Sequence, residues 1–233
     1  MKIPNSKIIL PEQFDQVLEH ANSNAWELSY SSEKHQLVIS NEEEWIARIF
    51  LPWNMNWENE KLIPVDNFHC VLVAIKAGQA AVGYFHEKEL LDHKVFRAYM
   101  VRQKQGKSQI KHLKTKGKSR AGSRIRLEET ERFFEDISER LNRYENDFPI
   151  SVWGISCAKT LWPYFFGSET TPPFESGSEL LRSLPFHFHQ GSYEELEMAG
   201  KLINQFHWLP NSDKNIEIVL SGSKESEPDE DDW

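Results

Sequence analysis

Two cysteines and no long apolar run set the first limits on this chain of 233 residues. Cys70 and Cys157 are too few for a disulfide scaffold and too isolated for a zinc knuckle, so we interpret both as reduced thiols. No run approaches the roughly 18–20 apolar residues that span a bilayer, and the first residues, MKIPN, do not open a signal peptide. These features predict a cytoplasmic protein without membrane contact.

The motifs of the common nucleotide-driven and hydrolytic enzymes are also missing. The sequence contains no P-loop, no G-x-G-x-x-G, no G-x-S-x-G and no H-E-x-x-H. His187 and His189 alternate along an expected strand, but no Cys or further His lies at a spacing that would complete a zinc site. We therefore expect ordinary packing and hydrogen bonding for this pair, no metal site and no cofactor.

Carboxylates are absent from one long segment, residues 100–127, although the chain carries 36 Asp and Glu and a net charge of -9. Ten of the 27 Lys and Arg residues lie in it: Arg102, Lys104, Lys107, Lys111, Lys114, Lys116, Lys118, Arg120, Arg124 and Arg126. Gly and Ser residues interrupt any apolar periodicity, which predicts an exposed loop over residues 102–126. Concentrated basic charge on an acidic protein favours one focused contact with phosphates, and these ten cations are predicted to bind RNA. A solvated linker is the alternative. The segment has no aromatic residue, so base stacking is not its mode of binding.

Gln109 is the candidate catalytic residue of this loop. A glutamine is a poor acid or base, but its amide can orient a water or hydroxyl group while backbone N–H groups stabilise charge. Gly106, three residues earlier, permits a close approach of the backbone to a sugar-phosphate. A G-x-x-Q pattern alone has very little specificity.

Hydrophobic periodicity predicts the elements on both sides of the loop. Before it we expect a helix, a two-stranded hairpin, a strand or short helix, a linker and three strands in a meander, at 11–25, 26–41, 43–53, 54–64 and 70–101. After it we expect a helix, a strand, a short helical turn, a strand and a last helix with Ser192 as N-cap, at 127–144, 149–157, 161–167, 183–189 and 192–206.

This order predicts an α/β fold with a mixed β-sheet flanked by helices. Residues 1–60 would form an N-terminal helix and hairpin extension, and residues 65–210 the main domain. Residues 221–233 are acidic and lack apolar periodicity, which predicts a disordered tail. The tail would be a solvating segment or a competitor of RNA for the basic loop.

Three runs together resemble the release-factor-like VLRF domain, which occurs in ankyrin-repeat and zinc-finger tRNA-cleaving factors of ribosome quality control and in shorter bacterial relatives. The runs are HKVFRAYMVRQKQGKSQ, AGSRIRLEETERFFEDISERL and SLPFHFHQGSYEELEMAGKL, within residues 65–207. Relatives show V-R-x-K, then G-x-x-Q, then a basic stretch, then A-G-S-x-x-R before a helix. The chain is identified as a short, bacterial-type member.

The resemblance implies a fold similar to the catalytic middle domain of eukaryotic-type peptide release factors. It implies that Gln109 takes the place of the functional glutamine and Gly106 that of the leading glycine of the release-factor loop. The implied activity severs a nascent chain from its tRNA, by hydrolysis of the peptidyl ester or by cleavage near the tRNA 3′ CCA end. Some relatives have a second glycine where Lys107 stands, so the loop here is less permissive.

We therefore expect a monomeric peptidyl-tRNA hydrolase or tRNA endonuclease of release-factor-like type. Its partners would be the large ribosomal subunit and peptidyl-tRNA, and not DNA. Two other hypotheses remain open. One is a non-catalytic RNA-binding or ribosome-binding module that uses the same basic loop, and the other is a protein-interaction domain whose loop is masked by its own acidic tail.

Overall fold

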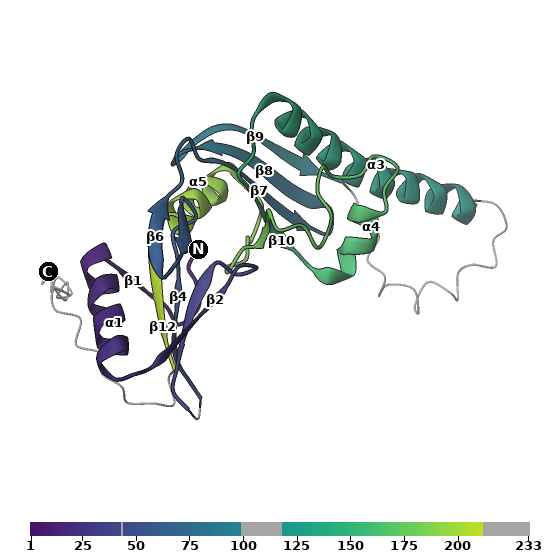
Figure 1. The fold of residues 1–233 in the computed structure, drawn as a ribbon. Helices are drawn as coiled ribbons and strands as arrows, with labels where there is room; N and C mark the ends of the chain where they lie inside the picture. Colours follow the sequence, from purple (N-terminus) through teal and green to yellow (C-terminus); the bar gives the residue numbers. More distant parts are fainter. Residues whose placement is uncertain (43, 99–117, 212–233) are drawn as a thin grey trace, which may run out of the picture.

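The strands in the part of the chain that the structure describes form two five-stranded sheets and one separate hairpin (Figure 1). The computed structural model describes residues 1–42, 44–98 and 118–211, and for residues 118–127 it describes the backbone alone. The first sheet is antiparallel, in the order β1-β12-β4-β3-β2, and the second is mixed, in the order β11-β10-β7-β8-β9. Helices flank both sheets, which confirms the predicted fold class.

The first sheet and its helix are built mainly from the N-terminal residues. The strands are β1 (Lys7–Ile9), β2 (Glu27–Ser31), β3 (Gln36–Ser40), β4 (Trp45–Phe50) and β12 (Phe206–Pro210). Helix α1 (Pro11–Ser23) begins with the predicted proline and buries Phe14, Val17 and Ala21 against the sheet. The predicted first helix and hairpin are confirmed. The segment that could be strand or helix is strand β4.

Strand β12 was not predicted. It lies between β1 and β4, and it pairs antiparallel with both. Residues far apart in the sequence therefore share one sheet. The predicted division into residues 1–60 and residues 65–210 stays a prediction, although the last described strand lies in the sheet formed by the N-terminal residues.

The predicted linker over residues 54–64 is wrong. These residues form a hairpin of β5 (Met55–Glu58) and β6 (Lys61–Pro64). Asn59 and Glu60 make its two-residue turn, and both have positive φ angles of 50° and 59°. A two-residue turn with two positive φ angles matches the twist of two paired strands. The polar residues Asn59 and Glu60, which suggested a linker, therefore form the turn of a hairpin.

The second sheet consists of β7 (His69–Lys76), β8 (Gln79–His86), β9 (Glu89–Arg97), β10 (Val152–Cys157) and β11 (Leu181–Ser183). Strands β7, β10 and β11 are parallel, and β8 and β9 complete the predicted meander. Side chains of β7 alternate between two cores. Val71, Val73 and Ile75 enter one, and Cys70, Leu72 and Ala74 enter the other. This burial on both faces explains the continuous apolar run in the sequence.

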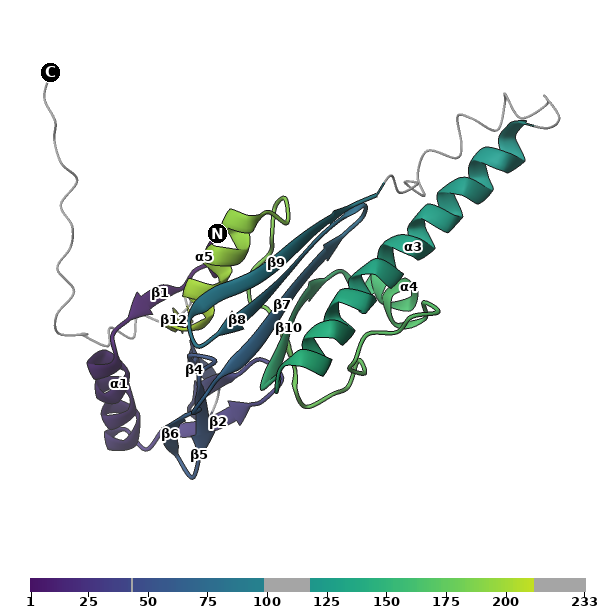
Figure 2. The same cartoon turned by 90° about the horizontal axis from the view of Figure 1, so that it is seen from above.

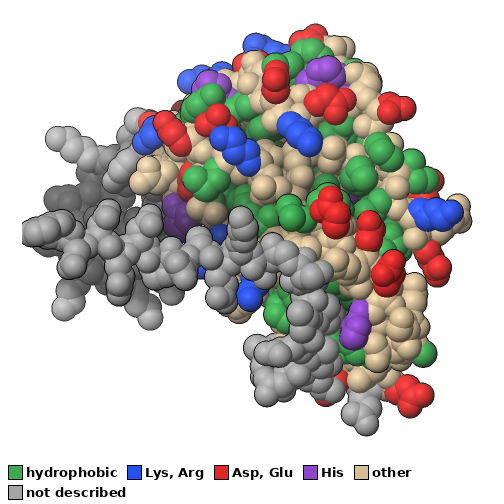
Figure 3. Space-filling view, turned by 90° about the vertical axis from the view of Figure 1, so that its left-hand side faces the viewer, with side chains coloured by type: hydrophobic (Ala, Val, Ile, Leu, Met, Phe, Trp, Pro, Cys, Tyr) green, Lys and Arg blue, Asp and Glu red, His purple; other side chains and the backbone are tan. Residues whose placement is uncertain are grey.

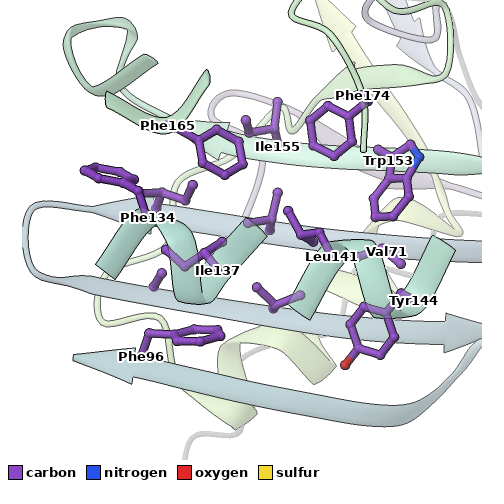
Figure 4. Packing of buried hydrophobic residues seen from close by; sticks show 14 of the residues in the cluster. Val71, Phe96, Phe134, Ile137, Leu141, Tyr144, Trp153, Ile155, Phe165 and Phe174 are labelled. Atoms are coloured by element: carbon purple, nitrogen blue, oxygen red, sulfur yellow. The ribbon is translucent and has the colours of Figure 1, made fainter. Parts of the chain in front are cut away.

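One face of the second sheet is covered by the long helix α3 (Lys118–Asp147), with the 3₁₀ turn η3 (Lys159–Leu161) and the short helix α4 (Trp162–Phe166) beside it. Apolar side chains of α3 pack on the sheet and on α4, as Figure 4 shows for Phe134, Ile137, Leu141 and Tyr144. Phe133 belongs to the same core. The opposite face is covered by α5 (Tyr193–Ile203). Ser192 caps α5 as predicted, because its hydroxyl accepts a hydrogen bond from the Glu195 backbone N–H.

Two further predictions about elements need correction. Helix α3 begins at Lys118, nine residues before the predicted start at Leu127, so residues 118–126 of the predicted loop are helical. Lys, Arg and Ala are good helix formers, and a single Gly122 costs a helix only about 1 kcal/mol. The predicted strand over residues 183–189 is also wrong beyond Ser183, where β11 ends.

None of the helices in the described ranges combines the length and the apolar character that crossing a lipid bilayer requires.

Candidate RNA-binding and catalytic site

The candidate catalytic residues, Gln109 and Gly106, lie outside the described residues. So do six of the ten predicted RNA-binding residues: Arg102, Lys104, Lys107, Lys111, Lys114 and Lys116. The residues that precede and follow this segment are described. Their geometry fixes where the segment leaves the fold and where it returns.

The segment leaves the fold at the end of β9. Arg97 pairs with Gln79 of β8, and the backbone N–H of Ala98 then donates a hydrogen bond of 2.9 Å to the carbonyl of Gly78. Gly78 lies in the turn between β7 and β8 with φ 78°, a conformation that favours glycine. Ala98, the last described residue before the segment, is therefore hydrogen-bonded at the end of the sheet where β7 ends.

The segment returns to the fold through α3. This helix has 30 residues and a length of about 45 Å at 1.5 Å per residue. Its N-terminal part extends beyond the end of the sheet, whereas its C-terminal part lies across the sheet (Figure 2). Four predicted RNA-binding residues belong to the first three turns of α3: Lys118, Arg120, Arg124 and Arg126. A helix N-terminus carries a partial positive charge of its own.

The part of α3 that lies on the sheet is held firmly. Arg140 forms an ion pair with Asp92 of β9, and its guanidinium lies 4.8 Å from the ring centre of Tyr144. Burial is the main cause that raises the pKa of Tyr144 to about 12, so this phenol stays neutral. The helix that carries the basic residues is thus attached to the strand that precedes the loop.

A cavity of about 570 Å³ opens at the same end of the sheet. Its walls come from the ends of β7 and β10, from residues 158–162 and from residues 183–188. A smaller cavity of about 300 Å³ lies between Ala98 and α3, and its lining includes Arg97, Glu129, Arg132 and Asp136. A third cavity, of about 880 Å³, is lined by Asn142 of α3 and by residues 166–176, which include Glu169 and Glu175. Its carboxylates make it unsuited to RNA.

Neither cysteine has the properties of a nucleophile. Burial raises the pKa of Cys157 to about 12, and burial also raises the pKa of Cys70 well above its usual value. Both thiols are free, as expected, and both stay protonated at neutral pH.

The two histidines of the H-x-H pattern have different surroundings. His187 lines the cavity of about 570 Å³, and the His189 imidazole lies 3.4 Å from a carboxylate oxygen of Glu195. Within the described ranges, no group of three or more His, Cys, Asp or Glu is placed to hold a metal ion.

Glu195 holds residues 189–191, which include the second histidine of the H-x-H pattern, through hydrogen bonds. Its carboxylate accepts hydrogen bonds from the backbone N–H groups of His189, Gln190 and Gly191, at 2.6, 2.8 and 2.7 Å. Burial alone would raise the pKa of Glu195, but these hydrogen bonds lower it overall. The carboxylate therefore fixes the turn before α5.

Sequence reasoning missed Lys76, Lys159 and Trp162, which line the cavity near the loop ends. They come from two segments about 80 residues apart and form no motif. The one signal in the sequence is the lack of any carboxylate in residues 153–165.

A comparison with known protein families shows the family of this chain. Residues 70–209 match the family described as Bacteroidetes VLRF1 release factor. The chain belongs to this family. The matched residues include β7 to β9, the basic segment, α3 and α5, so the VLRF resemblance predicted for residues 65–207 is confirmed.

Two other comparisons complete the picture of this VLRF1 release-factor family member. No curated protein matches the chain. Among solved structures it is similar to the Vms1 mitochondrial localization core, with 12% sequence identity, a TM-score of 0.43 and coverage of 90% of this chain and 93% of that one.

Proposed function

We propose that this protein is a release-factor-like enzyme that frees nascent chains from peptidyl-tRNA on stalled ribosomes in the cytoplasm. The observation that carries the proposal is the family match over residues 70–209, which spans the G-x-x-Q segment together with the strand and helix that hold it. The geometry of the two anchors supports it. A loop that starts at a fixed strand end and returns through a projecting helix can reach into a deep RNA site.

Gln109 is the residue to which we assign the chemistry. In one version its amide positions a water molecule, whose oxygen bonds to the ester carbonyl carbon while the bond to the tRNA 3′ oxygen breaks and that oxygen takes a proton. In the other version a ribose 2′-OH attacks the adjacent phosphate near the CCA end, giving a cyclic phosphate and a 5′-OH. Gly106 permits the close approach of the backbone.

The basic residues hold the RNA in this proposal. Lys104, Lys107, Lys111 and Arg124 contact the acceptor stem and ribosomal RNA, and the other cations of residues 102–126 add to the attraction. Residues 65–210 form the catalytic domain, and residues 1–60 are an extension of it. The protein acts as a monomer on the large ribosomal subunit.

The test is release from stalled ribosome–nascent-chain complexes by wild type, Gln109→Ala and a matched control, Gln103→Ala. The control makes the same change elsewhere in the same segment. We expect wild type and Gln103→Ala to release the chain and Gln109→Ala to lose most of the activity. Equal release by all three would overturn the role of Gln109.

A second function is favoured by Lys107, which stands where some relatives have the second glycine. A non-catalytic RNA-binding or ribosome-binding module would bind ribosomes through the basic segment and release nothing. It would keep its affinity in Gln109→Ala and lose it when several loop lysines become Gln. Release by the wild type excludes this alternative.

A further inference from the structure

The cavity of about 570 Å³ has the size and the walls of a ligand site. Ligand cavities generally measure about 300–1,000 Å³ and combine apolar walls with a few polar groups. Here Ile75, Ile155 and Phe188 supply apolar wall, and Ser156, Thr160, Ser183 and His187 supply polar groups. A nucleobase needs this combination, a flat apolar surface with hydrogen-bonding groups around its edge.

The charge of the lining selects an anion. Lys76 and Lys159 both line this cavity, and no Asp or Glu of the described residues does. Both lysines are exposed, and neither forms an ion pair with a described carboxylate. The Lys76 ammonium donates a hydrogen bond of 2.9 Å to the carbonyl of His189, which holds it in place without neutralising it. Two uncompensated cations beside an apolar cavity fit a phosphate-bearing ligand.

The surface away from this cavity has a different distribution of charge. On the face of the molecule shown in Figure 3, acidic and basic side chains are interspersed. Such a face gives no preference for a polyanion. The lysine-bearing cavity is therefore a local feature rather than a consequence of the overall charge, which is negative.

Trp162 supplies a fixed aromatic ring in the cavity wall. Its indole N–H donates to the carbonyl of Cys157, the last residue of β10, at 3.4 Å. Its ring lies 5.2 Å from that of Phe166. Single-stranded RNA is bound by aromatic rings of this kind, on which an unpaired base stacks while cations contact the neighbouring phosphates. The basic segment itself has no aromatic residue and cannot do this.

The cavity wall is connected to described residues that precede and follow the basic segment. Ala77 lines the cavity, and the next residue, Gly78, holds Ala98 at the exit of β9. On the other side, Tyr164 of α4 stacks on Phe134 of α3 with ring centres 6.1 Å apart. The wall that contains Trp162 is thus packed on the helix that carries the basic residues. The cavity is therefore linked by hydrogen bonding and packing to β9 and α3, the two elements that flank residues 99–117.

We propose that this cavity binds an unpaired nucleotide of the RNA, with its base stacked on Trp162 and its phosphates at Lys76 and Lys159. The inference rests on the proposed function, since it takes RNA as the ligand. It adds a base-stacking site to a protein whose basic segment supplies phosphate contacts alone. The polar groups around the cavity contact the edge of the base.

The test titrates a short single-stranded RNA ending in CCA into the ¹⁵N-labelled full chain and follows the indole N–H signal of Trp162, assigned with Trp162→Phe. We expect this signal to shift with saturation. A signal that stays in place while backbone signals of the basic segment move would overturn the inference. An apolar peptide that shifts the Trp162 signal when RNA does not would overturn it too.

Affinities of variants give a second measure. Trp162→Leu should weaken binding of the same RNA about tenfold, and Trp162→Phe should restore most of it, since loss of one stacked base costs about 1–3 kcal/mol. Lys76→Gln and Lys159→Gln should each weaken binding about threefold at low salt. Lys88→Gln, at the opposite end of β8, is the matched control and should leave affinity unchanged. Affinities of the Trp162 and lysine variants within twofold of wild type would overturn the inference.

The two proposals fail in different ways. A wild type that shifts the Trp162 signal but releases no nascent chain contradicts the proposed function and supports the nucleotide site. A wild type that releases chains without any Trp162 shift contradicts the nucleotide site alone.

Discussion

Gly154 in the middle of β10 leaves the space that the indole ring of Trp53 occupies. A Cβ atom at position 154 would lie 2.8 Å from the Trp53 ring and 2.5 Å from Leu72. Trp53 comes three residues after the end of β4, a strand of the first sheet. Its backbone N–H donates a hydrogen bond to the carbonyl of Ile203, and its ring belongs to the core between the second sheet and α5. Packing around this one glycine joins the two sheets.

We predict that Gly154→Ala lowers the free energy of unfolding by about 1–3 kcal/mol, because the extra carbon overpacks a buried contact. Urea unfolding measures this change. Gly177→Ala is the matched control, since no atom lies within 4 Å of a Cβ there. A Gly154→Ala variant as stable as wild type would show that the sheets do not pack as described.

His35 makes the stability of the protein depend on pH. The side chain is fully buried, its Nε2–H donates to the carbonyl of Pro52 at 3.0 Å, and its Nδ1 accepts from the Tyr30 hydroxyl at 2.7 Å. Burial first, and the charge of Arg182 second, lower the pKa of His35 from 6.5 to about 3. The imidazole is therefore neutral in the folded protein over the whole range from pH 7 to pH 4.

Because the unfolded chain binds a proton near pH 6.5 and the folded chain does not, stability falls as the pH drops below about 6.5. His35 alone should lower the free energy of unfolding by about 2 kcal/mol between pH 7 and pH 5. In His35→Asn, whose side chain tolerates the φ of 47° at this position, the loss over the same range should be smaller by that amount. Identical pH profiles for the two proteins would contradict a buried neutral His35.

RNA binding should depend strongly on salt. If about five cations of residues 102–126 contact single-stranded RNA, the logarithm of the association constant should fall with the logarithm of salt concentration at a slope of roughly -3 to -4. Replacing Lys104, Lys107 and Lys111 with Gln should make the slope shallower by about 2. Fluorescence anisotropy of a labelled RNA measures both slopes. A slope near zero for wild type would favour a solvated linker.

The elements predicted correctly from the sequence are those whose own pattern of apolar residues shows which of their faces are buried. The apolar run of β7 indicated burial on two faces, and the stripe of Phe133, Phe134, Ile137 and Leu141 indicated a helix on a sheet. Both patterns are local and need no knowledge of the partner. The family resemblance could likewise be recognised from the sequence alone, because the motifs that carry it occur in a fixed order along the chain.

The errors have a common physical origin in polar or aromatic residues whose role depends on distant contacts. Residues 184–189 alternate buried Phe186 and Phe188 with exposed residues, as a strand would, but they pack against α5 and the sheet without strand pairing. The joining of β12 to the first sheet is likewise a long-range contact that periodicity cannot show. The cavity with Trp162 could not be predicted, because its walls come from separate segments.

The most direct measurement follows peptidyl-tRNA on stalled large ribosomal subunits by gel, with wild type and Gln109→Ala, and maps the 3′ end of the liberated tRNA. The account predicts that wild type converts peptidyl-tRNA to free tRNA and that Gln109→Ala leaves it intact. An intact CCA end in the product indicates ester hydrolysis, and a shortened end indicates tRNA cleavage. Peptidyl-tRNA that stays intact with the wild-type protein bound to the subunit would contradict the proposed enzymatic function.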